Sequence, residues 1–70
     1  MEREIERFTV TGDDGTAYEV VGYQEFIRDG AGNWIPGMKH LEIAGTGAAV
    51  NFVDDNTFKI FDTGEVLRRT

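Results

Sequence analysis

The chain has 70 residues, a formal net charge of −6, 40% hydrophobic residues and 29% charged residues. This length indicates one domain over residues 1–70, and this composition is too apolar for a disordered chain. The sequence contains no cysteine, which excludes disulfides, thiolate metal sites and thiol nucleophiles, and its one histidine is His40. The acidic balance repels phosphate backbones and anionic lipid, so binding to nucleic acid or membranes is not expected.

Short runs of β-branched and aromatic residues, separated by glycine-containing turns, predict six strands. The first run covers residues 6–11 and places Phe8 and Val10 on one face. Ile5 is out of phase with that face, which fits a helical turn or an irregular lead-in. The second run covers residues 16–28, and its apolar residues change face near Gly22. A glycine at a change of face predicts a β-bulge or a sharp bend.

The third run covers residues 34–44 and is interrupted early by Pro36. Proline has no backbone N–H to give to a neighbouring strand, so the start of this run is expected to be an edge or irregular segment. Beyond the proline, Leu41 and Ile43 are expected to face the core, and His40 and Glu42 are expected to face outwards.

Three shorter runs, residues 49–53, 57–61 and 65–69, complete the set. In the second of these runs, Phe58 and Ile60 are expected to face inwards and Lys59 outwards. Gly64 stands where a hairpin turn needs positive φ. All the connections are too short for parallel crossovers. The predicted fold is therefore all-β, a small antiparallel meander of five to six strands that forms either a closed barrel or a strongly bent sheet.

The C-terminal third of the chain resembles a group of small uncharacterised bacterial proteins. The resemblance is carried by Val50-Asn51, by Val53-Asp54-Asp55, by Thr57-Phe58-Lys59-Ile60 and by the segment from Thr63 to Arg69. It implies a bacterial source and a short free-standing protein. The group has no established activity, cofactor or partner, so the resemblance assigns a role to no residue of this chain.

Oxygen-bearing turn residues form the first candidate site. In a meander, successive turns alternate between the two ends of the sheet, so Asp29 and Asn33 are expected at the same end as Asp54, Asp55 and Asn56. Hard cations such as calcium prefer such ligands. The chain does not match a calcium-loop motif, however, and Asp and Asn in turns usually bind local backbone N–H groups. We therefore expect no metal site and no cofactor, and keep this cluster as a weak candidate.

The second candidate is an apolar surface formed by Trp34, Ile35, Pro36 and Met38. If these side chains are exposed together, they mark a contact surface for a protein partner. The alternative is that Trp34 covers an open end of the core, because a small domain needs most of its apolar area for stability.

No catalytic constellation is evident, so an enzyme is not predicted. The favoured function is a protein-interaction module that binds an unknown protein partner or itself, and the alternative is a structural domain that forms homo-oligomers. Single-stranded nucleic-acid binding is a distant third, because it needs a positively charged groove. The segment from Met1 to Arg7 is charged and does not read as a signal peptide, so a cytoplasmic location is expected.

Overall fold

A computed structural model describes residues 1–70 as an all-β protein. The strands are β1 (Glu2–Thr11), β2 (Ala17–Arg28), β3 (Trp34–Ile43), β4 (Ala49–Asp54), β5 (Thr57–Ile60) and β6 (Val66–Arg69). Each strand pairs antiparallel with the next, and β6 returns to pair with β1, which closes a barrel. The predicted six-strand meander is confirmed, and the closed barrel is the alternative that forms. No helix of membrane-spanning length and hydropathy is present.

The core lies inside the barrel and follows the period-2 alternation of its strands. As predicted, Leu41 and Ile43 on β3 and Phe58 and Ile60 on β5 point inwards. All six strands contribute, and the buried cluster consists of Val10, Val20, Leu41, Ile43, Val50, Phe58, Ile60 and Leu67. Phe8 packs against this cluster from β1, so every strand depends on the others for its apolar burial.

The barrel closes along a narrow seam between β1 and β6. Only Val10 with Arg69 and Thr11 with Arg68 pair across it. The Arg69 guanidinium strengthens the seam, because it lies 4.1 Å from the ring centre of Phe8 and 5.4 Å from that of Phe58. Its Nε also donates a hydrogen bond of 3.1 Å to the Asp55 carbonyl. One side chain thus joins three strands and the β4–β5 turn.

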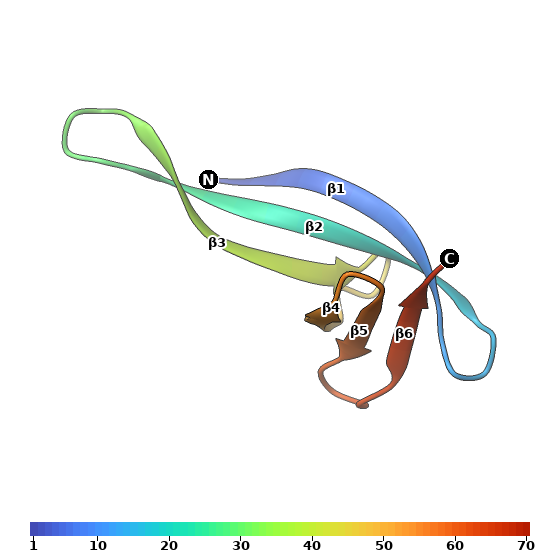
Figure 1. Cartoon of the computed structure of the whole chain (residues 1–70). Coiled ribbons are helices and arrows are strands. Elements are labelled where there is room, and N and C mark those ends of the chain that lie inside the picture. Colours follow the sequence, from blue (N-terminus) through green and yellow to red (C-terminus); the bar gives the residue numbers. More distant parts are fainter.

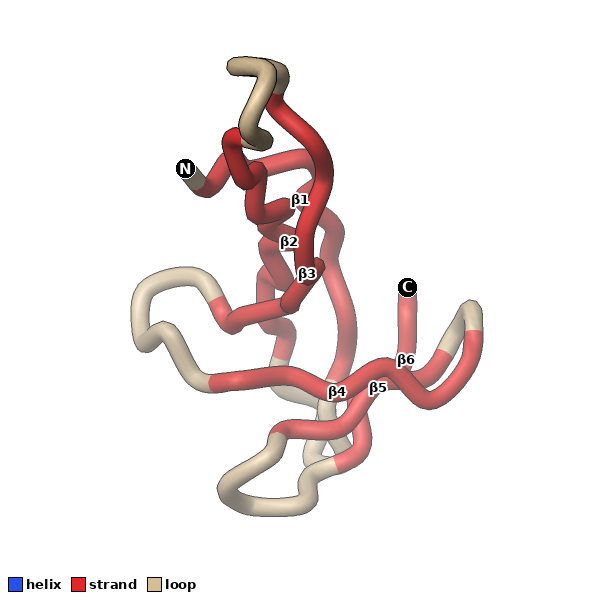
Figure 2. Tube along the Cα trace, turned by 90° about the vertical axis from the view of Figure 1, so that its left-hand side faces the viewer, coloured by secondary structure: helices blue, strands red, loops and turns tan.

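The first three strands extend well beyond the barrel (Figure 1). The molecule measures 49 × 20 × 18 Å, and its radius of gyration of 13.9 Å exceeds the value of about 11 Å expected for a compact chain of this length. We call this extension the arm; it comprises residues 2–5, 23–28 and 34–40 and the turn 29–33. Figure 2 looks along the arm and shows β4, β5 and β6 on one side of it only.

The structure corrects the predicted start of the chain. The first strand begins at Glu2 rather than at residue 6, and Ile5 is the extra residue of a β-bulge between Glu4 and Glu6. Of the two alternatives for Ile5, the helical turn is therefore wrong, and an irregular segment of the strand forms. The cause is the pairing with β2, which holds Glu2, Arg3 and Glu4 opposite Glu25, Gln24 and Tyr23.

Gly22 is not itself bulged, because it pairs regularly with Glu6 on one side and Leu41 on the other. A Cβ at this position would lie 2.7 Å from the Cγ of Glu6 and 3.3 Å from a methyl of Leu41. The glycine therefore allows close packing of Glu6 and Leu41, and the bulge lies in β1 directly beside its partner Glu6. The irregularities lie on its partner strands, at Ile5 in β1 and at Gly37 and Met38 in β3.

Truncating a core side chain should destabilise the barrel strongly. Leu67 is fully buried and is paired with Phe58, so Leu67→Ala should lower the free energy of unfolding by about 3 kcal/mol. Met38→Ala is the control, because Met38 is 79% exposed and its loss should change stability by less than about 0.5 kcal/mol. Urea unfolding followed by circular dichroism measures both, and equal effects would contradict the described core.

The seam makes a separate prediction. Arg69→Lys should lower the free energy of unfolding by about 1 kcal/mol, because lysine lacks the planar group that covers both rings. Arg68→Lys, at the neighbouring exposed position, should have little effect. Urea unfolding of the two variants gives the comparison, and a stability of Arg69→Lys equal to that of wild type would show that the stacking is unimportant.

Candidate functional site

Six of the nine exposed large apolar side chains lie on the arm or directly before it, and the other three, Phe52, Val53 and Phe61, lie on the barrel side. Trp34 is 49% exposed, and Ile35 and Met38 are exposed beside it. Trp34 lies at the start of β3, opposite Arg28, and is not part of the core cluster. The alternative in which Trp34 covers an open end of the core is therefore wrong, because β2 and β3 carry it beyond the barrel. Neighbouring strands add the exposed side chains of Met1, Ile5 and Ile27.

The start of β3 is an edge, as Pro36 predicted. Residues 34–36 pair with β2 on one side, whereas β4 pairs with β3 only at Leu41 and Glu42. The missing N–H of Pro36 therefore costs no hydrogen bond on the open side. On the opposite edge of the arm, β6 pairs with β1 only at Val10 and Thr11, so residues 2–5 of β1 are also unpaired on their outer side.

The arm has two distinct faces, because directly opposed residues on antiparallel strands share a face. The inner face continues the inward-facing side of the barrel and carries Arg3, Gln24, Phe26, Arg28, Trp34, Pro36 and Lys39. The outer face carries the exposed pair Ile27 and Ile35. Near the tip, the inner face contains a hollow of about 310 Å³ lined by Met1, Arg3, Phe26 and Trp34.

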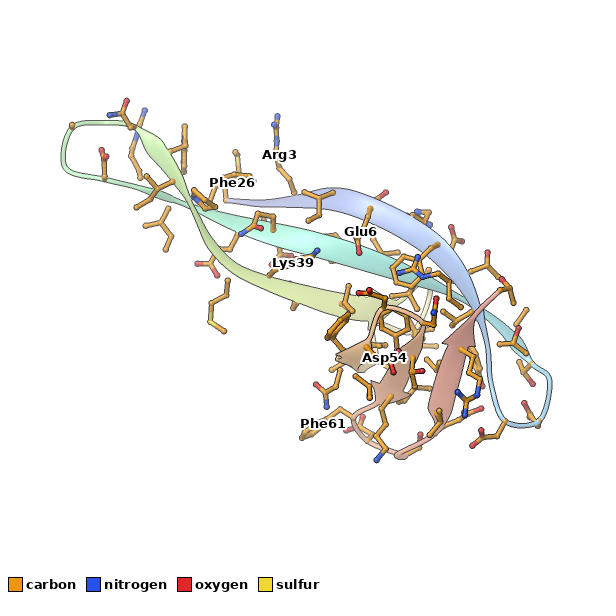
Figure 3. The ribbon with its side chains drawn as sticks, viewed as in Figure 1. Arg3, Glu6, Phe26, Lys39, Asp54 and Phe61 are labelled. Carbon is orange, nitrogen blue, oxygen red and sulfur yellow. The ribbon has the colours of Figure 1, made fainter.

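A larger depression lies on the same face where the arm meets the barrel, and we call it the corner. It measures about 360 Å³, and Leu41, Val50 and Phe58 form its apolar floor. Phe52, which is 63% exposed, stands at its side. Glu6 and Lys39 line the arm side of the corner and form an ion pair of 3.5 Å. Figure 3 shows these two residues at the junction of arm and barrel, with Arg3 and Phe26 farther out.

The outer face is dominated by charged and hydrogen-bonded groups. Arg7 pairs with Glu4 at 2.9 Å and with Glu19 at 3.1 Å, and its hydrogen bond lowers the pKa of the Glu4 carboxyl. His40 contacts Glu42 through Nε2 at 2.9 Å, and its ring stacks on Tyr23 with centres 5.3 Å apart. His40 and Glu42 thus face outwards, as predicted. These contacts stiffen the base of the arm.

The candidate metal cluster does not assemble. The turn of Asp29 and Asn33 lies at the tip of the arm, and the turn of Asp54 and Asp55 lies on the barrel (Figures 1 and 3). The prediction assumed strands of equal length, whereas β2 and β3 carry their turn far beyond that of β4 and β5. The carboxylates instead accept hydrogen bonds from backbone N–H groups of their own turns. Asp29 accepts from Ala31 and Asn33, and Asp54 accepts from Asn56. No group of three or more His, Cys, Asp or Glu side chains is arranged to hold a metal ion.

The sequence identified three of the six exposed apolar side chains on or beside the arm and missed the other three. Trp34, Ile35 and Met38, with Pro36, were selected because they lie close together in the sequence. Met1, Ile5 and Ile27 were missed, because only strand pairing brings them to the arm. The position of Ile27 could have been inferred from the sequence. The segments on both sides of the turn 29–33 read as paired strands, and this pairing places Ile27 opposite Ile35.

Comparison with known proteins adds no functional information. The chain matches no protein-family model, no curated protein and no solved structure.

The acidic turn between β4 and β5 predicts a pH dependence of stability. Hydrogen bonds from the Asn56 N–H and from Thr57 hold the pKa of Asp54 below its ordinary value of 3.8. A carboxyl whose folded pKa is depressed stabilises the fold above its unfolded pKa, and that stabilisation is lost as the pH falls through the folded pKa. Asp54→Asn keeps the shape of the side chain but cannot titrate. The variant should therefore lose less stability than wild type on acidification.

The measurement is urea unfolding from about pH 7 down to about pH 2. Asp62→Asn, at an exposed turn position, is the matched control and should follow the wild-type pH profile. Identical profiles for Asp54→Asn and wild type would show that the turn hydrogen bonds do not shift this titration.

Proposed function

We propose that this chain is a non-catalytic protein-interaction module of the bacterial cytoplasm and that the arm carries its contact surface. The observation that supports this most strongly is the extension of three strands beyond the barrel with large apolar side chains exposed along them. Trp34 and Met1 line the hollow of the inner face, and Ile27 and Ile35 are exposed together on the outer face. Exposed tryptophan and methionine beside polar groups are typical of protein contact surfaces.

The burial pattern supports a role for the arm beyond folding. The core cluster is confined to residues of the barrel, and none of its members lies in residues 23–40. Maintaining a paired arm with exposed Trp34 therefore contributes little to the core. A role as a contact surface would explain why large apolar side chains such as Trp34 lie outside the core. The two open edges add a second mode of contact, since an extended peptide can pair with an unpaired strand edge.

The test is capture of partners from a bacterial lysate on the immobilised domain, followed by mass spectrometry. Trp34→Ala should lose the captured protein, because truncation of a central aromatic removes much of the energy of a contact surface. Phe61→Ala is the matched control, because Phe61 is 68% exposed but lies on the barrel away from the arm (Figure 3). This variant should capture the same protein as wild type.

Two outcomes would contradict the proposal. Capture that persists in Trp34→Ala would exclude the tip of the arm as the contact surface. Recovery of no specific protein would argue against a partner of different sequence and leave the homo-oligomer, whose test is the size of the chain in solution.

A further inference from the structure

The strands of the arm separate their charges by face. Directly opposed residues of antiparallel strands share a face, and this register places every arginine and lysine of residues 2–5, 23–28 and 34–40 on the inner face. The same register places every carboxylate of these residues on the outer face. The inner cations are Arg3, Arg28 and Lys39, and the outer carboxylates are Glu2, Glu4 and Glu25. A chain with a net charge of −6 thus presents one basic face, on the side of the hollow and the corner.

Most of this positive charge is free to meet a partner. Arg3 and Arg28 take part in no ion pair within the chain. In the corner, Arg69 also makes no ion pair, and the one carboxylate there, Glu6, is already paired with Lys39. Two inner faces laid on each other would bring like charges together, so this face does not fit a second copy of itself.

Apolar and cationic rows alternate along the inner face from the corner to the tip. The inward positions of β2 mark these rows as Gly22, Gln24, Phe26 and Arg28. The row of Gly22 belongs to the corner and has an apolar floor. The row of Gln24 is cationic, because its partners on both neighbouring strands are Arg3 and Lys39. Phe26 lines the apolar hollow, and Arg28 ends the face with a second cationic row.

From this alternation we infer that the partner of the arm is an extended, acidic segment of another protein, in which apolar and acidic side chains take turns at every second residue. Side chains two residues apart in an extended chain point the same way and repeat every 6.6 Å or so, about the spacing of the rows along β2. Six residue steps from Gly22 to Arg28 span about 20 Å, so the segment has about seven residues.

In this register each side chain of the segment meets a group of the opposite or matching kind. One apolar side chain enters the corner, which measures about 360 Å³, and the next acidic one lies between Arg3 and Lys39. A second apolar side chain covers the hollow at Phe26, and a second carboxylate reaches Arg28. This inference rests on the proposed function of the arm and names the chemistry of its partner.

The two ends of the basic face favour a short acidic peptide over single-stranded nucleic acid. The turn beyond the tip contains Asp29. Beside the corner lies the turn of Asp54 and Asp55, because Arg69 lines the corner and donates a hydrogen bond to the Asp55 carbonyl. A polyphosphate strand that crosses the face continues towards these acidic turns, whereas a peptide can confine its carboxylates to the region between them.

The first experiment measures the binding of labelled synthetic peptides by fluorescence anisotropy. The test peptide carries phenylalanine and glutamate in turn at every second position, with serine between them, and is made in both chain directions of this pattern. The controls are a peptide of the same composition in scrambled order and one with lysine in place of glutamate. Wild type should bind the test peptide, in one direction or both, roughly tenfold more tightly than either control. Added salt should weaken this binding, because it screens exposed charges.

The second experiment reverses charges on the arm. Arg3→Glu and Arg28→Glu should each weaken binding of the test peptide by roughly tenfold or more. Lys59→Glu makes the same change in net charge at an exposed position of β5, between the buried Phe58 and Ile60, and should bind like wild type. A peptide with lysine in place of only the glutamate at the tip should restore binding to Arg28→Glu. Circular dichroism verifies that each variant is folded.

Three results would overturn the inference. They are a wild-type chain that does not distinguish the test peptide from its controls, binding that persists unchanged in Arg3→Glu and Arg28→Glu, and tighter binding of a labelled single-stranded oligonucleotide than of the test peptide. If wild type binds no peptide but captures a lysate protein through Trp34, the proposed function stands and the inferred chemistry of the partner is wrong. If wild type binds no peptide and captures no protein, both fail.

Discussion

The strands β1, β2 and β3 belong to the barrel only over the length at which the short strands β4 and β6 pair with β3 and β1. β2 has 12 residues and β3 has 10, whereas β5 and β6 have four each. Beyond Leu41 on β3 and Val10 on β1, the next strand of the barrel offers no partner. The remaining length continues as a three-stranded sheet with two open edges. The arm and the exposure of its apolar side chains both follow from this difference in strand length.

Open edges invite uncontrolled association, and each edge of the arm carries features that limit it. On β1, the charged residues Glu2, Arg3 and Glu4 are followed by a bulge at Ile5. On β3, Pro36 removes a donor, and Gly37 and Met38 interrupt the regular pairing. These features disfavour indiscriminate strand addition at the edges while leaving the inner face accessible. Specific contact through that face can therefore form without indiscriminate pairing through the edges.

The sequence predicted the barrel better than the arm. Alternation within single strands identified the inward positions Leu41, Ile43, Phe58 and Ile60, and Gly64 adopts the positive φ that its turn requires. The bulge at Ile5 left a signal, because Ile5 is out of phase with Phe8 and Val10, but the phase break alone did not distinguish a bulge within a paired strand from an unpaired lead-in. The pairing of the charged N-terminal residues was also missed, since their stability comes from β2 and not from their own composition. The prediction that the turn of Asp29 meets the turn of Asp54 assumed strands of equal length. The length of the arm places these two turns far apart.

The seam between β1 and β6 also determines how the molecule can open. All other pairings join strands that follow one another in the sequence, whereas this one brings together residues 10 and 69. Joining distant segments costs loop-closure entropy, and only two residue pairs, the Arg69 stacking on Phe8 and the hydrogen bonds from Thr70 to the Thr9 carbonyl compensate for it here. We expect β5 and β6 to detach as one unit before β1, β2 and β3 separate, so that amide hydrogens of the four-residue strands exchange faster than those at the centre of β2.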